Sequence, residues 1–190
     1  MTNENINLKL IHDLNSIDQE DFMLIKQAIK RKNELLNTNC KPLKFTSFEC
    51  VKINLVNYIK DAKYLQVIQL ILKENDNHTE LDEIKKISNS DLLSFLFWIM
   101  DELEAINQVE KELFNTPPTS EELEAGINNF NQFGVINTID ALAGGDILKW
   151  EKIVKLSYFD VLNKLYKNQV TNNFQQAYSK VLMRKNKIKR

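Results

Sequence analysis

The sequence of 190 residues contains little glycine, proline, cysteine and histidine. Its 4 glycines and 3 prolines are too few for the many tight turns of a β-sandwich and favour helices joined by short connections. Its 2 cysteines, Cys40 and Cys50, form no CxxC pair and have no histidine beside them. A structural zinc site needs four ligands. We therefore expect two reduced thiols, as in a cytoplasmic protein.

Targeting signals and catalytic motifs are also missing. The start of the chain, MTNENINLKL, has neither the basic region nor the apolar core of a signal peptide. No apolar run approaches the roughly 20 residues that span a bilayer. The 2 histidines, His12 and His78, stand in polar segments, and no nucleophile with a neighbouring base is visible. The sequence thus indicates a protein that is not an enzyme, without catalytic, cofactor-binding or metal-binding residues and without a membrane span.

Two short segments suggest a ligand site, and each lacks an essential residue. Asp76, His78, Glu80 and Asp82 are spaced like metal ligands, but a calcium loop of the helix–loop–helix kind needs a glycine at its sharp turn. The turn at residues 144–146, Gly-Gly-Asp, has a form that can hold phosphate at a helix start. It lacks the lysine and serine of a P-loop, and the aspartate would repel an anion. We interpret both segments as connections between helices.

Charge is distributed unevenly along the chain, although its formal net charge is -1. Residues 74–124 hold 3 Lys and 14 Asp or Glu, whereas residues 147–190 hold 11 Lys or Arg and 2 Asp or Glu. Three interpretations fit this pattern. The charged residues form solvated helix faces that attract each other within the fold, or complementary surfaces between copies in an oligomer, or a basic C-terminus that contacts nucleic acid.

Apolar residues recur at intervals of three and four, which predicts amphipathic helices over most of the chain. The fold class is therefore all-α, a multi-helix bundle of about seven to nine helices with a long C-terminal helix. The cluster Lys30-Arg31-Lys32 is interpreted as the solvated face of the first helix. The predicted helices span residues 17–37, 47–73 with an interruption at Asp61, 79–87, 90–113, three short segments within 120–156, and 157–184. Their predicted N-caps are Ser16, Ser47, Thr79, Ser90, Thr119, Asp146 and Ser157.

The adjacent prolines Pro117 and Pro118 interrupt the helical pattern, because proline cannot continue a helix. They predict a boundary between an N-terminal helical subdomain, residues 1–115, and a C-terminal helical subdomain with a basic tail, residues 116–190. All four glycines follow this boundary, within residues 125–158. Leu123, Ile127 and Phe130 are expected in one short helix, and the glycines are expected to separate three short helices from the long basic one.

Over residues 120–183, an acidic helix is followed by AG, FNQFG, IDALAGGD and ILKWEKIVKLSY, and then by a long helix with a basic tail. This order of features resembles small helical morphogenesis proteins of tailed bacteriophages. The segment LAGGDILKW, residues 142–150, carries most of this resemblance. The resemblance implies a structural or assembly protein of the head–tail connector or tail, located in the virion or in the host cytoplasm during assembly. Its expected partners are other copies of itself or other phage structural proteins.

The resemblance leaves two roles open, a ring component of the virion and a tail-assembly chaperone that is not retained. A chaperone needs exposed apolar surface, for which the stripe around Phe95, Trp98 and Trp150 is the candidate. A third role, from a different class, is a small helical protein that binds nucleic acid through its basic C-terminus. The residues expected to bind a partner are Phe130, Phe133, Trp150, Tyr158, Lys180, Arg184, Lys185, Lys187, Lys189 and Arg190.

Overall fold

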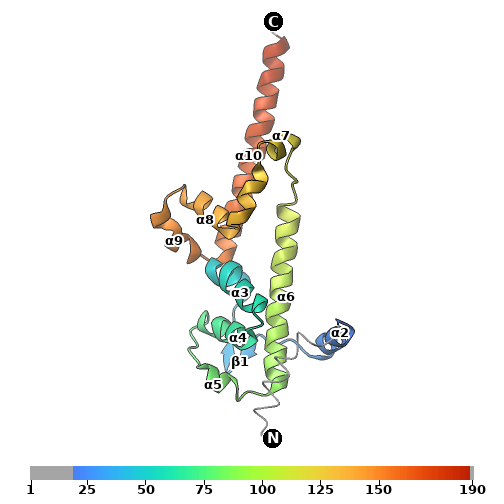
Figure 1. Cartoon of the computed structure of the whole chain (residues 1–190), viewed down its shortest axis with the longest axis vertical. Coiled ribbons are helices and arrows are strands. Elements are labelled where there is room, and N and C mark those ends of the chain that lie inside the picture. The colour runs from blue at the N-terminus through green and yellow to red at the C-terminus, as the bar shows by residue number, and fades with distance from the viewer. Residues whose placement is uncertain (1–18, 189–190) are drawn as a thin grey trace.

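The structure is a computed structural model that describes residues 19–188, with side chains for residues 24–185. It is an all-α fold, as predicted, with nine α-helices among the described residues and one small hairpin (Figure 1). The α-helices are α2 (Gln19–Ala28), α3 (Leu55–Lys60), α4 (Tyr64–Lys73), α5 (Leu81–Ile84), α6 (Asn89–Leu113), α7 (Ser120–Glu124), α8 (Val135–Ala143), α9 (Trp150–Val154) and α10 (Tyr158–Ile188). The remaining elements are strands β1 (Glu34–Leu35) and β2 (Thr38–Asn39), 3-10 helices η1 (Leu43–Phe45), η3 (Ile127–Phe133) and η4 (Ile147–Lys149), and a π-helical turn η2 (Cys50–Asn54).

The first predicted helix is shorter than expected, since α2 ends at Ala28 and not near residue 37. The chain then turns into the antiparallel hairpin of β1 and β2, where Leu36 and Asn37 have φ values of 50° and 59°. Such left-handed conformations cannot occur within an α-helix. Leu35 of the hairpin is buried in the core. A continued helix would have directed this side chain elsewhere, so the hairpin gains its apolar burial. The spacing of apolar residues alone did not reveal that a hairpin competes with a helix at this point.

One hydrophobic cluster forms the core, and α6 runs through its centre. Phe95, Leu96 and Ile99 of α6 are fully buried in this cluster, and α6 packs against α4, β1 and η1. Each large side chain buried in this way contributes about 1.5–3 kcal/mol. Ile139 of α8 and Val161 of α10 belong to the same cluster. Because the cluster includes residues from both sides of the expected boundary, the two subdomains share one core, and the boundary between them stays a prediction.

Four of the predicted N-caps are present. Ser47, Thr119, Asp146 and Ser157 each accept a backbone N–H two or three residues later. Thr119 and Glu122 complete a reciprocal capping box. Two other caps were predicted wrongly, and the N-cap predicted at Ser16 lies outside the described residues.

The cap of α6 is Ser88 and not Ser90, because the Asp91 N–H reaches the Ser88 hydroxyl at 3.2 Å. Two serines stand within one turn here, and the sequence did not distinguish them. Thr79 also caps no helix, since its hydroxyl bonds the side chain of Asn77 and Glu80 occupies the cap position of α5. The side chain of Asn77 thus competes successfully for a local hydrogen bond.

The glycines separate the short helices of residues 120–156. Gly144 adopts a left-handed φ of 69° at the C-cap of α8, as the sequence predicts. Gly126, with φ of 85°, instead divides the segment that was expected to form one helix through Leu123, Ile127 and Phe130. The prediction of a single helix was therefore wrong, and α7 and η3 are separate elements.

The base of α10 is joined to the body by backbone hydrogen bonds. The Tyr158 N–H donates to the Thr46 carbonyl at 2.9 Å, and the Phe48 N–H donates to the Leu156 carbonyl at 2.8 Å. From this base, α10 extends along the long axis of the molecule and ends beyond every other labelled helix (Figure 1). The fold therefore presents one helix that is anchored at its first turns and projects at its end.

Candidate functional site

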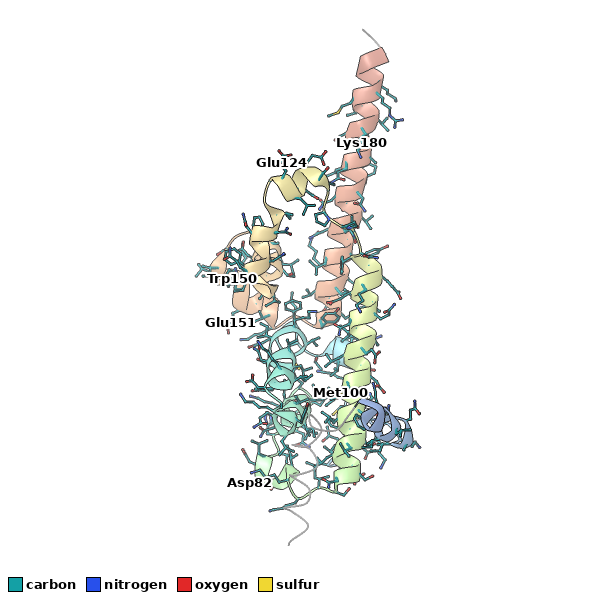
Figure 2. The ribbon with its side chains drawn as sticks, turned by 45° about the vertical axis from the view of Figure 1, so that its right-hand side comes forward. Asp82, Met100, Glu124, Trp150, Glu151 and Lys180 are labelled. Carbon is teal, nitrogen blue, oxygen red and sulfur yellow. The ribbon has the colours of Figure 1, made fainter. Side chains whose placement is uncertain are left out.

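The projecting part of α10 is the longest run of exposed residues within one helix among residues 24–185. Tyr158 and Val161 are buried, but every residue from 170 to 185 is exposed. Side chains of this free segment, residues 170–185, are drawn around Lys180 in Figure 2. Most helical stability in proteins comes from packing of an apolar face. A free segment of this length therefore lacks the contacts that ordinarily hold a helix together.

The free segment carries large apolar side chains. Phe174 is 67% exposed, Tyr178 is 54% exposed and their rings stack at 6.0 Å between centroids. Val170 and Val181 extend the same stripe, with 50% and 37% exposure. We call Tyr166, Val170, Phe174, Ala177, Tyr178 and Val181 the outer face of α10. A contiguous apolar stripe of this kind is a mark of an interaction surface in a folded protein.

The outer face lies on a different side of α10 from the side that packs on the body. Tyr158, Val161 and Leu165 form the packed side. At about 100° per residue, the outer face is centred about 150° around the helix axis from this side. Apolar residues therefore change sides along one helix. The packed side anchors α10, and the outer face remains available.

The packed side continues along α10 as a row of amides. A groove of about 760 Å³ lies between this row, the end of α6 and α8. Asn168, Gln169 and Asn172 line it from α10, and Phe114 and Thr116 line it from the opposite wall. The Gln169 Oε1 atom is buried without a hydrogen-bond partner among the described residues. Because this side of α10 lines the groove together with Phe114 and Thr116, the outer face points away from residues 114–116.

Positive charge accompanies the outer face. No acidic residue follows Asp160 in the chain. The side chains of Lys180, Arg184 and Lys185 are exposed, and none takes part in an ion pair within the described part of the chain. The surface is therefore apolar along its middle and basic toward its C-terminal end.

The acidic middle of the chain is partly neutralised within the fold, by residues that the sequence did not suggest. Asp101 of α6 binds Lys26 at 2.9 Å and Arg31 at 2.7 Å. Glu110 binds Lys52 at 2.8 Å, and Asp91 binds Lys32 at 3.2 Å. Two members of the Lys30-Arg31-Lys32 cluster thus pair with α6 and are not simply a solvated face. Lys149 and Lys155 pair locally with Asp146 and Glu151. The described basic side chains after Asp160 take part in no ion pair among the described residues, so they remain the uncompensated part.

The pKa values follow from these contacts. Burial alone would raise the pKa of Asp101, but the hydrogen bonds from Arg31 and Lys26 outweigh it and lower the pKa. The hydrogen bond to Asp101 raises the pKa of Lys26. Burial, followed by the hydrogen bond to Glu110, raises the pKa of Tyr158. Each shift favours the protonation state in which the contact forms, so these contacts join α6 to its neighbours.

The aromatic residues predicted to bind a partner differ in their exposure in the structure. Phe130 and Phe133 of η3 are exposed at 57% and 49%. Trp150 is half-buried, and its Nε1 donates to Asp140 at 3.3 Å. Tyr158 is a correction, since it is 2% exposed and its hydroxyl bonds Glu110. Its ring belongs to the core and is not available to a partner.

The basic residues of that prediction lie along one end of α10. Lys180, Arg184 and Lys185 are exposed on the free segment, while the side chain of Lys187 and all of Lys189 and Arg190 lie outside the described residues. Phe95, part of the stripe considered for a chaperone client, is fully buried. Val170, Phe174 and Val181 follow the apolar periodicity of the helix predicted over residues 157–184, and such a stripe normally faces the core. The absence of acidic residues after Asp160 marks this end of the helix as basic, but no signal in the sequence shows that the stripe is exposed.

Within residues 19–188, no three His, Cys, Asp or Glu side chains lie close enough to hold a metal ion. No helix in that range combines the length and apolarity needed to cross a membrane.

Comparison with known proteins adds no relative. No protein-family model, no curated protein and no solved structure matches this chain.

Proposed function

We propose that this chain is a non-enzymatic assembly protein that works by protein–protein contact through the free segment of α10. The outer face of α10 carries this proposal, because it exposes aromatic and aliphatic side chains over a helix segment without packing. Three half-exposed rings, Tyr166, Phe174 and Tyr178, present on the order of 300 Å² of apolar surface. Burying this surface against a partner recovers the free energy that the isolated helix lacks.

The biological setting that we propose is the head–tail connector or tail of a tailed bacteriophage, in which the chain is a ring component of the virion. This part rests on the resemblance of residues 120–183. A ring protein needs a surface for each neighbour, and the apolar, basic end of α10 is suited to one such contact. A tail-assembly chaperone that leaves before maturation is the alternative within the same setting.

Sedimentation equilibrium tests the contact. The wild-type chain, 22.2 kDa as a monomer, is expected to self-associate, and Phe174→Ser with Tyr178→Ser is expected to weaken the association at least tenfold. The matched control is Asn163→Ser with Thr171→Ser, also on exposed positions of α10. A wild-type chain that stays monomeric, with no partner among the structural proteins of its own particle, contradicts the proposal. Mass spectrometry of mature particles separates the roles, because a ring component is present and a chaperone is absent.

Nucleic-acid binding is the second candidate function. The absence of acidic residues after Asp160 and the exposure of Lys180, Arg184 and Lys185 favour it. A titration with duplex DNA over a range of salt concentrations tests it, since each neutralised phosphate adds to the salt dependence of the affinity. Binding that falls steeply with salt supports this function, and no binding at low salt excludes it.

A further inference from the structure

The surface formed by α7 and η3 is acidic, whereas the exposed charged residues that accompany the outer face of α10 are basic. No basic residue occurs between Lys111 and Lys149. Within this stretch, Glu121, Glu122 and Glu124 of α7 are exposed. Exposed apolar side chains accompany them, Leu123 at 48%, Ile127 at 39%, Phe130 at 57% and Phe133 at 49%. We call these seven residues the acidic face.

Two symmetric copies of α10 are poor partners for each other. An antiparallel pair of α10 helices places Lys164 and Lys167, which precede the free segment, near Lys180 and Arg184 of the second copy. A parallel pair places each basic residue beside its own equivalent. Either arrangement sets like charges together and costs free energy. The outer face therefore fits an apolar surface that is acidic.

We infer that the outer face of α10 in one copy binds the acidic face of the next copy. This inference rests on the proposed function and names its partner. Both faces expose aromatic rings. The acidic face carries three glutamates, whereas Lys180, Arg184 and Lys185 accompany the outer face at its C-terminal end, so the charges are opposite in sign. Such complementarity selects the correct partner and speeds encounter.

The placement of the two faces suits a repeating contact. Figure 2 shows Glu124 on α7 and Lys180 on α10 at neighbouring levels along the long axis. The amide row of α10 is turned toward residues 114–116, which lead into α7, and the outer face lies about 150° away. The outer face therefore points away from the segment that leads into α7, and the two surfaces are formed by different elements of one molecule. A contact between different surfaces is heterologous, and its repetition closes a ring or extends a filament.

The outer face supplies a substantial part of the area of a specific contact. It extends over residues 166–181, about 24 Å at 1.5 Å per residue, and half of a cylinder of that length and about 10 Å diameter has an area of about 380 Å². A stable interface of standard size buries about 800 Å² on each partner. The outer face thus supplies nearly half of that area, and the side chains at its edges add to it.

Charge exchange between the two faces tests the inference. The first variant carries Glu121→Lys and Glu124→Lys, which leave the capping box of Thr119 and Glu122 intact. The second carries Lys180→Glu and Arg184→Glu. Each is expected to weaken self-association at least 100-fold by sedimentation equilibrium, because like charges then meet across the contact. A chain with all four substitutions is expected to return to within about tenfold of the wild type, and a mixture of the first two variants is expected to co-associate.

Each outcome has one meaning. Recovery in the four-residue variant supports the contact. If the first variant associates like the wild type, α10 does not bind the acidic face and the inference is overturned, while the proposed function stands. If the wild type remains monomeric, the inference is also overturned, and the proposed function then rests on other proteins of the particle. Helix content measured by circular dichroism verifies that each variant is folded.

Discussion

The phenolic hydroxyl of Tyr158 donates a 2.8 Å hydrogen bond to the carboxylate of Glu110. The same carboxylate accepts two contacts from Lys52, at 2.8 and 3.0 Å. Glu110 therefore joins the base of α10, the end of α6 and the π-helical turn η2. Because Tyr158 is also buried, this contact fixes the point from which the free segment of α10 projects.

Removal of the shared acceptor is expected to cost more than removal of one donor. Tyr158→Phe keeps the pair of Glu110 and Lys52 and should lower the free energy of unfolding by about 1 kcal/mol. Glu110→Ala leaves a buried hydroxyl and a partly buried ammonium group unpaired, and should lower it by about 2–3 kcal/mol. Glu112→Ala, on the exposed side of α6, is the control and should change it by less than about 0.5 kcal/mol. Urea unfolding measures all three, and equal losses in the first two variants contradict the shared role.

Asp101 is expected to make stability depend on pH. Its pKa in the folded protein is lowered by Arg31 and Lys26, so its contribution is present above the unfolded pKa of about 3.9 and is lost as pH falls through the folded value. Since the side chain is 38% exposed, Asp101→Asn should cost only about 1 kcal/mol at neutral pH.

Urea unfolding at several pH values measures this effect. The difference between wild type and Asp101→Asn should shrink below pH of about 4. Glu104→Gln is the control, because its carboxylate is 77% exposed and 3.5 Å from Lys26. A difference that is constant between neutral and strongly acidic pH contradicts this role of Asp101.

Both cysteines are expected to react slowly in the native protein. Burial, reinforced by the charge of Glu74, raises the pKa of Cys50 to about 12, and burial raises the pKa of Cys40 to about 11. The thiolate is the reactive form. Modification by a disulfide reagent at pH of about 8 should therefore be at least 100-fold slower than in the unfolded chain. Rapid modification of either thiol in the folded protein contradicts their placement in the core.

Gly144 is expected to be required for the end of α8. With φ of 69° it stands in the left-handed region, where a side chain is disfavoured. Gly144→Ala should lower the free energy of unfolding by about 1 kcal/mol. Gly144→Asn is the matched control, since asparagine tolerates this conformation best among the other residues, and it should cost less. Thermal unfolding compares the two, and equal effects contradict the role of the backbone conformation.

Local signals predicted the fold best where one residue had one evident role. The capping box of Thr119 and Glu122, the cap at Ser157 and the left-handed Gly144 were each predicted from the sequence and are present. The hairpin after α2 was missed because Leu36 and Asn37 give no turn signal as strong as glycine. The cap at Ser88 was missed because Ser90 competes with it within one turn.

The candidate site was predicted only in part, because exposure depends on tertiary packing. An apolar stripe along a helix normally identifies the side that faces the core. Tyr158 and Val161 follow this rule, whereas Phe174 and Val181 of the same helix do not. Only the structure shows that α10 extends beyond the helices that pack against its first turns. The spacing of apolar residues therefore does not reveal where α10 changes from a packed to an exposed surface.

The central claim is that the free segment of α10 is an interface between copies of the chain. Amide hydrogen exchange at high and low protein concentration, in low salt, tests it most directly. An unpacked helix opens readily, and association should slow its exchange. The account predicts that residues 166–185 and residues 120–133 gain protection together as concentration rises, while α6 is unchanged. Equal exchange of residues 166–185 at both concentrations would contradict it.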